Sequence, residues 1–137
     1  LRGEGAVRGT GGEGPPRFWQ WNRYTPVAEC NAAVREGDWK LVRPRIPEAM
    51  MVAPEDTAVD RQLKEVPCPI TDITRTPEPA RTLSAPPPSL LFNIAADPYE
   101  RHDLATREPE RVRRLEAALA AWFEAVNADR LRSAAVE

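Results

Sequence analysis

The sequence predicts an α+β fold: a small antiparallel β-sheet of about four strands packed by one C-terminal α-helix, with a long proline-rich excursion. Two observations carry this prediction. Apolar residues at spacings of three and four follow residue 108, which indicates a helix with one apolar stripe. Short runs rich in aromatic and aliphatic residues, bounded by turn residues, indicate strands near residues 18–21, 32–35, 39–43 and 90–94.

The second and third strands are expected to form a hairpin. Residues 36–38 (Glu-Gly-Asp) separate them and suit a tight turn, because Gly37 tolerates positive φ. Trp39, Leu41 and Arg43 should then share one face of the third strand, with the residues between them on the other face.

The last strand and the helix complete the unit. The apolar run at residues 90–94 predicts a strand in the centre of the sheet. The helix should begin near Glu108 with Pro109 at its first position, where the missing N–H costs nothing. We expect Glu110 and Arg114 to pair on its solvated face. The apolar stripe consists of Val112, Leu115, Leu119, Trp122, Phe123 and Val126.

Composition sets the boundaries. Residues 1–15 hold six of the seven glycines and predict a flexible lead-in. Residues 16–130 should form one folded unit, and residues 131–137 a tail. Inside the unit, residues 44–89 hold ten of the 15 prolines, which we expect to break every long element. We interpret this excursion as a segment that wraps the surface or is partly disordered; the alternative is a functional loop over a cleft.

Two segments carry a family resemblance. Residues 91–105, LFNIAADPYERHDLA, read as a strand, an Asp-Pro turn, an acidic bend and a helix start; residues 32–44, AAVREGDWKLVRP, read as a hairpin. Both resemble the C-terminal region of the sulfatases, the arylsulfatase-like sulfuric-ester hydrolases of the alkaline-phosphatase superfamily. The resemblance implies a subdomain that completes such an enzyme beside a large α/β catalytic domain, its main partner, which would precede Leu1.

The resemblance also implies two cofactors. Sulfatases use Ca²⁺ and a formylglycine made from Cys or Ser in a Cys/Ser-x-Pro-x-Arg motif. Cys30 is followed by no such Pro or Arg, and after Cys68 the proline comes one position too early, with Asp72 where Arg should stand. We therefore expect no catalytic residue, metal or cofactor in this chain, and both groups in the preceding part of the parent. Without a cysteine framework, two free thiols are favoured over a disulfide.

The acidic bend has its own interpretation. Asp97, Glu100 and Asp103 lie close in sequence but lack the glycine and the later glutamate of an EF-hand loop. We expect Asp97 to form the turn, Glu100 to bind backbone or an arginine, and Asp103 to close the bend. His102, the single histidine, should be solvated or capping, because no catalytic partner set accompanies it.

Residues 18–31 offer the candidates for contact with a sulfate ester substrate. Asn22, Arg23 and Tyr24 combine hydrogen-bond donors with an aromatic face, and we interpret them as substrate-binding. Trp19 and Trp21 are expected instead to pack the sheet against the catalytic domain.

Two alternatives stay open. One is a non-catalytic interaction module that presents the proline-rich zone to aromatic grooves, with Pro44-Arg45-Ile46-Pro47 as the nearest PxxP segment. The other is the same subdomain of a related phosphatase or phosphonate hydrolase. A net charge of −2 gives no bulk attraction to nucleic acid, and no apolar run has the length of a membrane span. The sequence does not indicate the cellular compartment of the protein.

Overall fold

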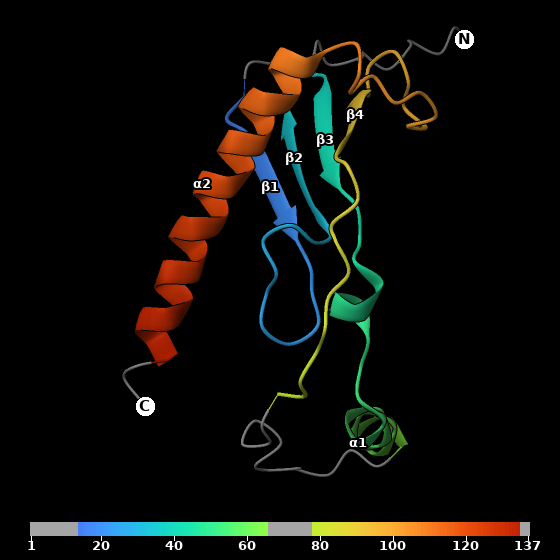
Figure 1. Ribbon diagram of the computed structural model, residues 1–137, viewed down its shortest axis with the longest axis vertical. Helices are drawn as coiled ribbons and strands as arrows, with labels where there is room; N and C mark the ends of the chain where they lie inside the picture. Colours follow the sequence, from blue (N-terminus) through green and yellow to red (C-terminus); the bar gives the residue numbers. More distant parts are fainter. Residues whose placement is uncertain (1–13, 66–77, 135–137) are drawn as a thin grey trace, which may run out of the picture.

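The computed structural model describes residues 14–65 and 78–134. In this part the chain forms a four-stranded sheet of order β1-β2-β3-β4, antiparallel at every pairing, with α2 across one face (Figure 1). The predicted α+β fold is confirmed. The elements are β1 (Arg17–Gln20), β2 (Ala32–Glu36), β3 (Trp39–Arg43), η1 (Pro47–Met50), α1 (Pro54–Glu65), β4 (Leu90–Asn93) and α2 (Pro109–Ala134).

The predicted hairpin joins β2 to β3. Glu36 pairs with Trp39, so the turn consists of residues 37 and 38. Gly37 has φ +55°, and a positive φ at the first turn position is what a type II′ hairpin turn requires.

The main core lies between the sheet and α2. Val34, Leu41, Leu91 and Leu115 are completely buried there, and Leu119 is almost so. Complete burial of an aliphatic side chain contributes about 1.5–3 kcal/mol each. The sheet is therefore held to the helix by its strand centres.

Helix α2 begins at Pro109 as predicted and follows the expected stripe as far as Trp122. Val126 is exposed, and the helix continues to Ala134, so residues 131–134 belong to it and not to a tail. The predicted Glu110–Arg114 pair is wrong. Glu110 pairs with Arg113, and Arg114 reaches across to Glu36 on β2.

Strand β4 lies at the edge of the sheet, so its predicted central position is wrong. Its apolar sequence has another explanation, because the following bend covers its free edge. The Leu91 N–H donates to Asp103 Oδ1 at 2.9 Å, and the Leu91 carbonyl accepts from the Leu104 N–H at 2.8 Å. These bonds satisfy groups that an open edge strand would offer to another chain.

Two aspartates shape the bend as predicted. Asp97 Oδ2 accepts from the N–H groups of Arg101 at 2.7 Å and His102 at 2.8 Å, and Asp103 closes the bend onto β4. Burial alone would raise the pKa of Asp97, but the two N–H donors lower it overall. Glu100 pairs with Lys40 at 2.6 Å, so the expectation of a backbone or arginine partner is wrong. His102 is exposed.

The proline-rich excursion contains regular structure, including the 12-residue helix α1, which corrects the prediction that its prolines break every long element. The short helix η1 begins at Pro47 and α1 begins at Pro54. A proline at the first helical position lacks only an N–H that would have no partner inside the helix. Helix α1 lies beyond the end of the sheet (Figure 1). Residues 66–77 lie outside the described part of the chain.

A second, smaller core sits under η1. Cys30, Ile46 and Ala49 are buried together, and the Ile46 N–H donates to Cys30 Sγ at 3.1 Å. Cys30 is a free thiol in the structure, whereas Cys68 falls outside the described residues. Because Ile46 is buried and Pro47 starts a helix, the PxxP segment is not presented as a free extended ligand.

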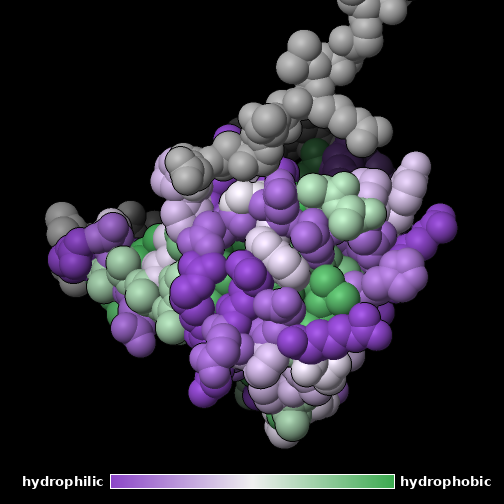
Figure 2. Space-filling model, turned by 90° about the horizontal axis from the view of Figure 1, so that it is seen from above, coloured by the Kyte–Doolittle hydropathy of each residue, from purple (hydrophilic) through white to green (hydrophobic). Residues whose placement is uncertain are grey.

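The end of the molecule at which α2 begins has a predominantly hydrophilic surface (Figure 2). Among the described residues, no helix combines the length and the apolar character that a membrane crossing requires.

Candidate functional site

The loop between β1 and β2 carries the predicted binding residues, and its own hydrogen bonds hold it in place. The Asn22 side chain accepts from the Val27 N–H at 3.1 Å and donates to the Cys30 carbonyl at 3.2 Å. Asn31 closes the loop, because its side chain donates to the Trp21 carbonyl at 2.7 Å. The Asn22 amide is thus used to shape the loop.

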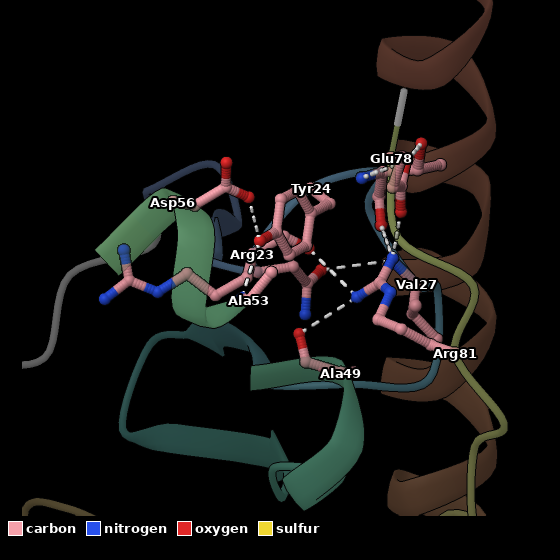
Figure 3. Close-up of polar contacts among 10 residues, drawn as sticks. Arg23, Tyr24, Val27, Ala49, Ala53, Asp56, Glu78 and Arg81 are labelled. Atoms are coloured by element: carbon pink, nitrogen blue, oxygen red, sulfur yellow. Dashed lines mark hydrogen bonds and ion pairs between the residues drawn. The ribbon is translucent and has the colours of Figure 1, made fainter. Parts of the chain in front are cut away.

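Tyr24 lies at the centre of the site (Figure 3). Its hydroxyl donates to the Asp56 carboxylate on α1 and accepts from the Ala53 N–H at 2.9 Å. The hydrogen bond to Asp56 raises the pKa of the Tyr24 phenol. Tyr24 has φ +55°, an uncommon conformation for a bulky residue, which costs free energy and persists only where surrounding contacts enforce it.

Arg81 supplies those contacts from the part of the excursion that returns to the sheet, residues 78–89, which we call the returning limb. Its guanidinium carbon lies 5.3 Å from the centre of the Tyr24 ring. It donates to the carbonyls of Arg23 at 3.1 Å, Ala49 at 3.2 Å and Thr25 at 3.3 Å. One side chain therefore joins the loop, η1 and the returning limb.

Glu78 completes this connection. Its carboxylate pairs with Arg81 and accepts hydrogen bonds from both the hydroxyl and the N–H of Thr25. The Thr25 hydroxyl is the main cause that lowers the pKa of Glu78. Three segments far apart in sequence thus meet at one polar cluster (Figure 3).

A groove of about 910 Å³ opens beside this cluster, within the range of roughly 300–1,000 Å³ typical of small-molecule sites. We call it the Tyr24 groove. The β1–β2 loop, α1, Glu78 and the far end of α2 form its sides. Its lining residues are Asn22, Arg23, Tyr24, Thr25, Pro26, Val52, Asp56, Thr57, Val59, Asp60, Leu63, Glu78 and Arg130.

The three predicted binding residues all line this groove, but their polar atoms differ in availability. The polar atoms of Asn22 and Tyr24 are engaged by protein partners. The Arg23 guanidinium stacks 4.6 Å from the Trp21 ring and makes no ion pair within residues 14–65 and 78–134. Arg23 is exposed, and of the three it alone has a side chain without a hydrogen-bond partner among the described residues.

Sequence reasoning missed Asp56, Glu78 and Arg81. The sequence predicts an excursion that wraps the surface or is partly disordered, and this prediction assigns no partner to any of its charged residues. No local signal identifies them, because Tyr24 and Asp56 are 32 residues apart and Thr25 and Glu78 are 53 apart. Their contacts depend on the path of the whole excursion.

A comparison with models of known protein families found no match, and a comparison with curated proteins found none. The sulfatase resemblance therefore rests on the two sequence segments that carry it.

No metal site forms in the part of the chain that the structure describes, where no three His, Cys, Asp or Glu side chains gather to hold an ion. Asp97 and Asp103 in the bend are both committed to backbone N–H groups. These residues do not form a Ca²⁺ site, and the Ca²⁺ that the resemblance implies is expected in the preceding part of the parent.

The face of the sheet opposite α2 is the other notable surface. Strand register places Trp19, Ala33, Val42 and Leu90 in one row across all four strands. Trp19 is 49% exposed, and Trp21, just past β1, is 55% exposed. This apolar row has no helix over it in the described structure (Figure 1).

Proposed function

We propose that this chain is the C-terminal subdomain of a sulfatase-type hydrolase, an enzyme that cleaves sulfate esters. The observation that carries the proposal is the bend at residues 97–105, where the chain resembles that family most. The resembling residues have specific structural tasks there. Asp97 forms the turn, and Asp103 joins the Leu91 N–H of β4 to the Ala105 N–H before α2. The residues that carry the resemblance are thus the ones that shape the bend, which supports the proposal.

The apolar row on the sheet face opposite α2 supports the same proposal. An antiparallel sheet can leave one face to water, but that face is then polar. Here the apolar row from Trp19 to Leu90 crosses the face opposite α2, beside basic residues at Arg17 and Arg35. Trp19 in this row is exposed and the other three residues are half-buried, and an exposed apolar patch is typical of an interaction site. We assign it to the α/β catalytic domain of the parent.

In this proposal the chain provides packing and part of the substrate cleft. The formylglycine and Ca²⁺ belong to the preceding part of the parent. The residues that would separate sulfate from phosphate esters also belong there, so a phosphatase or phosphonate hydrolase is the competing outcome of the test.

Two observations test the proposal. The gene should encode a Cys/Ser-x-Pro-x-Arg motif upstream of Leu1; its absence from a complete upstream sequence would refute the sulfatase assignment. In the longer protein, Trp19→Glu should separate or destabilise the two domains, because it places a charge in the docking row. The matched control is Tyr99→Glu, since Tyr99 is 76% exposed on the bend and should tolerate the change. Equal tolerance of both substitutions would contradict the docking surface.

A further inference from the structure

Helix α1 contributes one side of the Tyr24 groove with a mixed surface. Asp56, Val59, Asp60 and Leu63 all line the groove, and spacings of three and four place them on one face of the helix. Val59 and Leu63 are half-buried. An apolar strip is therefore flanked by two carboxylates.

Hydrogen-bond donors and acceptors are both available around this strip. Asp56 uses Oδ2 for Tyr24 and Asp60 uses Oδ2 for Lys64, and neither Oδ1 atom has a protein partner among the described residues. Arg130 uses Nε for Asn127 at 3.0 Å, which leaves its terminal amino groups without a described partner. Arg23 adds a second such guanidinium.

This combination indicates a hydroxylated ring. A hydroxyl group donates to a carboxylate oxygen and accepts from a guanidinium, so it matches both kinds of group at once. The C–H face of a sugar ring can pack on Val59 and Leu63. A plain aryl or steroid ring would cover the carboxylates and guanidinium groups without pairing them, which costs free energy.

The charges also limit the ligand. Asp56, Asp60 and Glu78 line the same groove as the two arginines. A heavily sulfated polymer would meet three carboxylates there, and like charges disfavour binding. A neutral ring that bears a single sulfate suits this mixture of three carboxylates and two guanidinium groups better.

We propose that the Tyr24 groove binds the alcohol part of the sulfate ester, and that this part is a saccharide. The inference rests on the proposed function, since it names the substrate class of that enzyme. Tyr24 acts as a positioning residue. Its hydroxyl is satisfied by Asp56 and Ala53, and its task is to hold α1 as one side of the groove.

The test uses the longer protein and two variants on neighbouring positions of α1. Leu63→Trp fills the groove, whereas Gln62→Trp adds the same ring at an exposed position outside the lining. The substrates are a panel of monosulfated monosaccharides and 4-nitrophenyl sulfate. We expect Leu63→Trp to lower kcat/KM for the best sugar sulfate by about tenfold or more, and Gln62→Trp to change it by less than about twofold. The kcat/KM for 4-nitrophenyl sulfate should change little in either variant. An equal loss for sugar and aryl esters, or no loss for either, would overturn the inference.

Direct binding separates this inference from the proposed function. Saturation-transfer NMR with the unsulfated sugars should show contact with the parent protein and with Gln62→Trp, and loss of contact with Leu63→Trp. Sulfate hydrolysis without any such contact would overturn the saccharide groove and leave the sulfatase assignment standing. Sugar contact without hydrolysis of any sulfate ester would overturn the sulfatase assignment and support the groove.

Discussion

The Phe18 ring on β1 stacks on the Trp122 ring of α2, with centroids 5.3 Å apart and 6° between the planes. This contact joins the outer strand of the sheet to the helix. Trp122→Ala should lower the free energy of unfolding by about 3 kcal/mol, because it removes buried ring surface and an aromatic pair.

Arg113→Ala is the matched control for that experiment. Arg113 lies on the exposed side of α2 and, among the described residues, pairs only with Glu110, so its loss should change the free energy by less than about 0.5 kcal/mol. Urea unfolding of both variants gives the comparison. Similar losses would show that the assigned helix face is wrong.

Tyr24→Phe should loosen α1 and leave α2 unchanged. The substitution removes the hydroxyl that bonds Asp56 and the Ala53 N–H, and α1 has no buried residue of its own to hold it. Hydrogen exchange of residues 54–65 should therefore become several-fold faster, with little change in residues 109–122. Tyr99→Phe is the control, as its exposed ring should have no effect. Unchanged exchange in α1 would mean that other contacts position the helix.

Asp97 should contribute a pH-dependent part of the stability. Its pKa in the fold lies below the ordinary value of 3.8, so the stabilisation is present above that pH and is lost as the pH falls through the folded-state pKa. Near neutral pH, the Tm of the Asp97→Asn variant should thus lie a few degrees below the Tm of the unsubstituted protein. The gap should close in acid below about pH 4. A gap of constant size from neutral to acid pH would exclude this role.

Arg23→Ala in the longer protein should reduce kcat/KM for a bulky sulfate ester by about tenfold or more, as expected for one lost charge-assisted contact. Stability should hardly change, because Arg23 is exposed. The smaller 4-nitrophenyl sulfate should be affected less. Unchanged kinetics on all esters would exclude Arg23 from the cleft, and a loss of folding would assign the loop to the domain interface.

The parts of the fold that depend on local pattern could be predicted from the sequence. The apolar stripe through Leu115 and Leu119 follows from the spacing of apolar residues along the helix. The turn at Gly37 follows from the tolerance of glycine for positive φ. Helix α1 could have been predicted by the argument applied to Pro109, since Pro54 also stands at a first helical position. The edge position of β4 could not, because an edge strand covered by a bend has the same apolar sequence as a central one.

The candidate site could be predicted only in part. The stretch from Asn22 to Tyr24 was identified by its residue types, and all three residues do line one groove. Arg81, which joins that loop to η1, depends on tertiary contacts that have no local sequence signature. Its role appears only when the excursion is seen to return beside the loop.

Sulfate release by the longer protein in the presence of Ca²⁺ tests the central claim most directly. The intact protein should release sulfate from sulfate esters faster than it releases phosphate from the matching phosphate esters, and the 137-residue chain alone should release none, since it holds no nucleophile of the required motif. Absence of sulfate release by the intact protein, a preference for phosphate esters, or saturable turnover by the isolated chain would contradict the account.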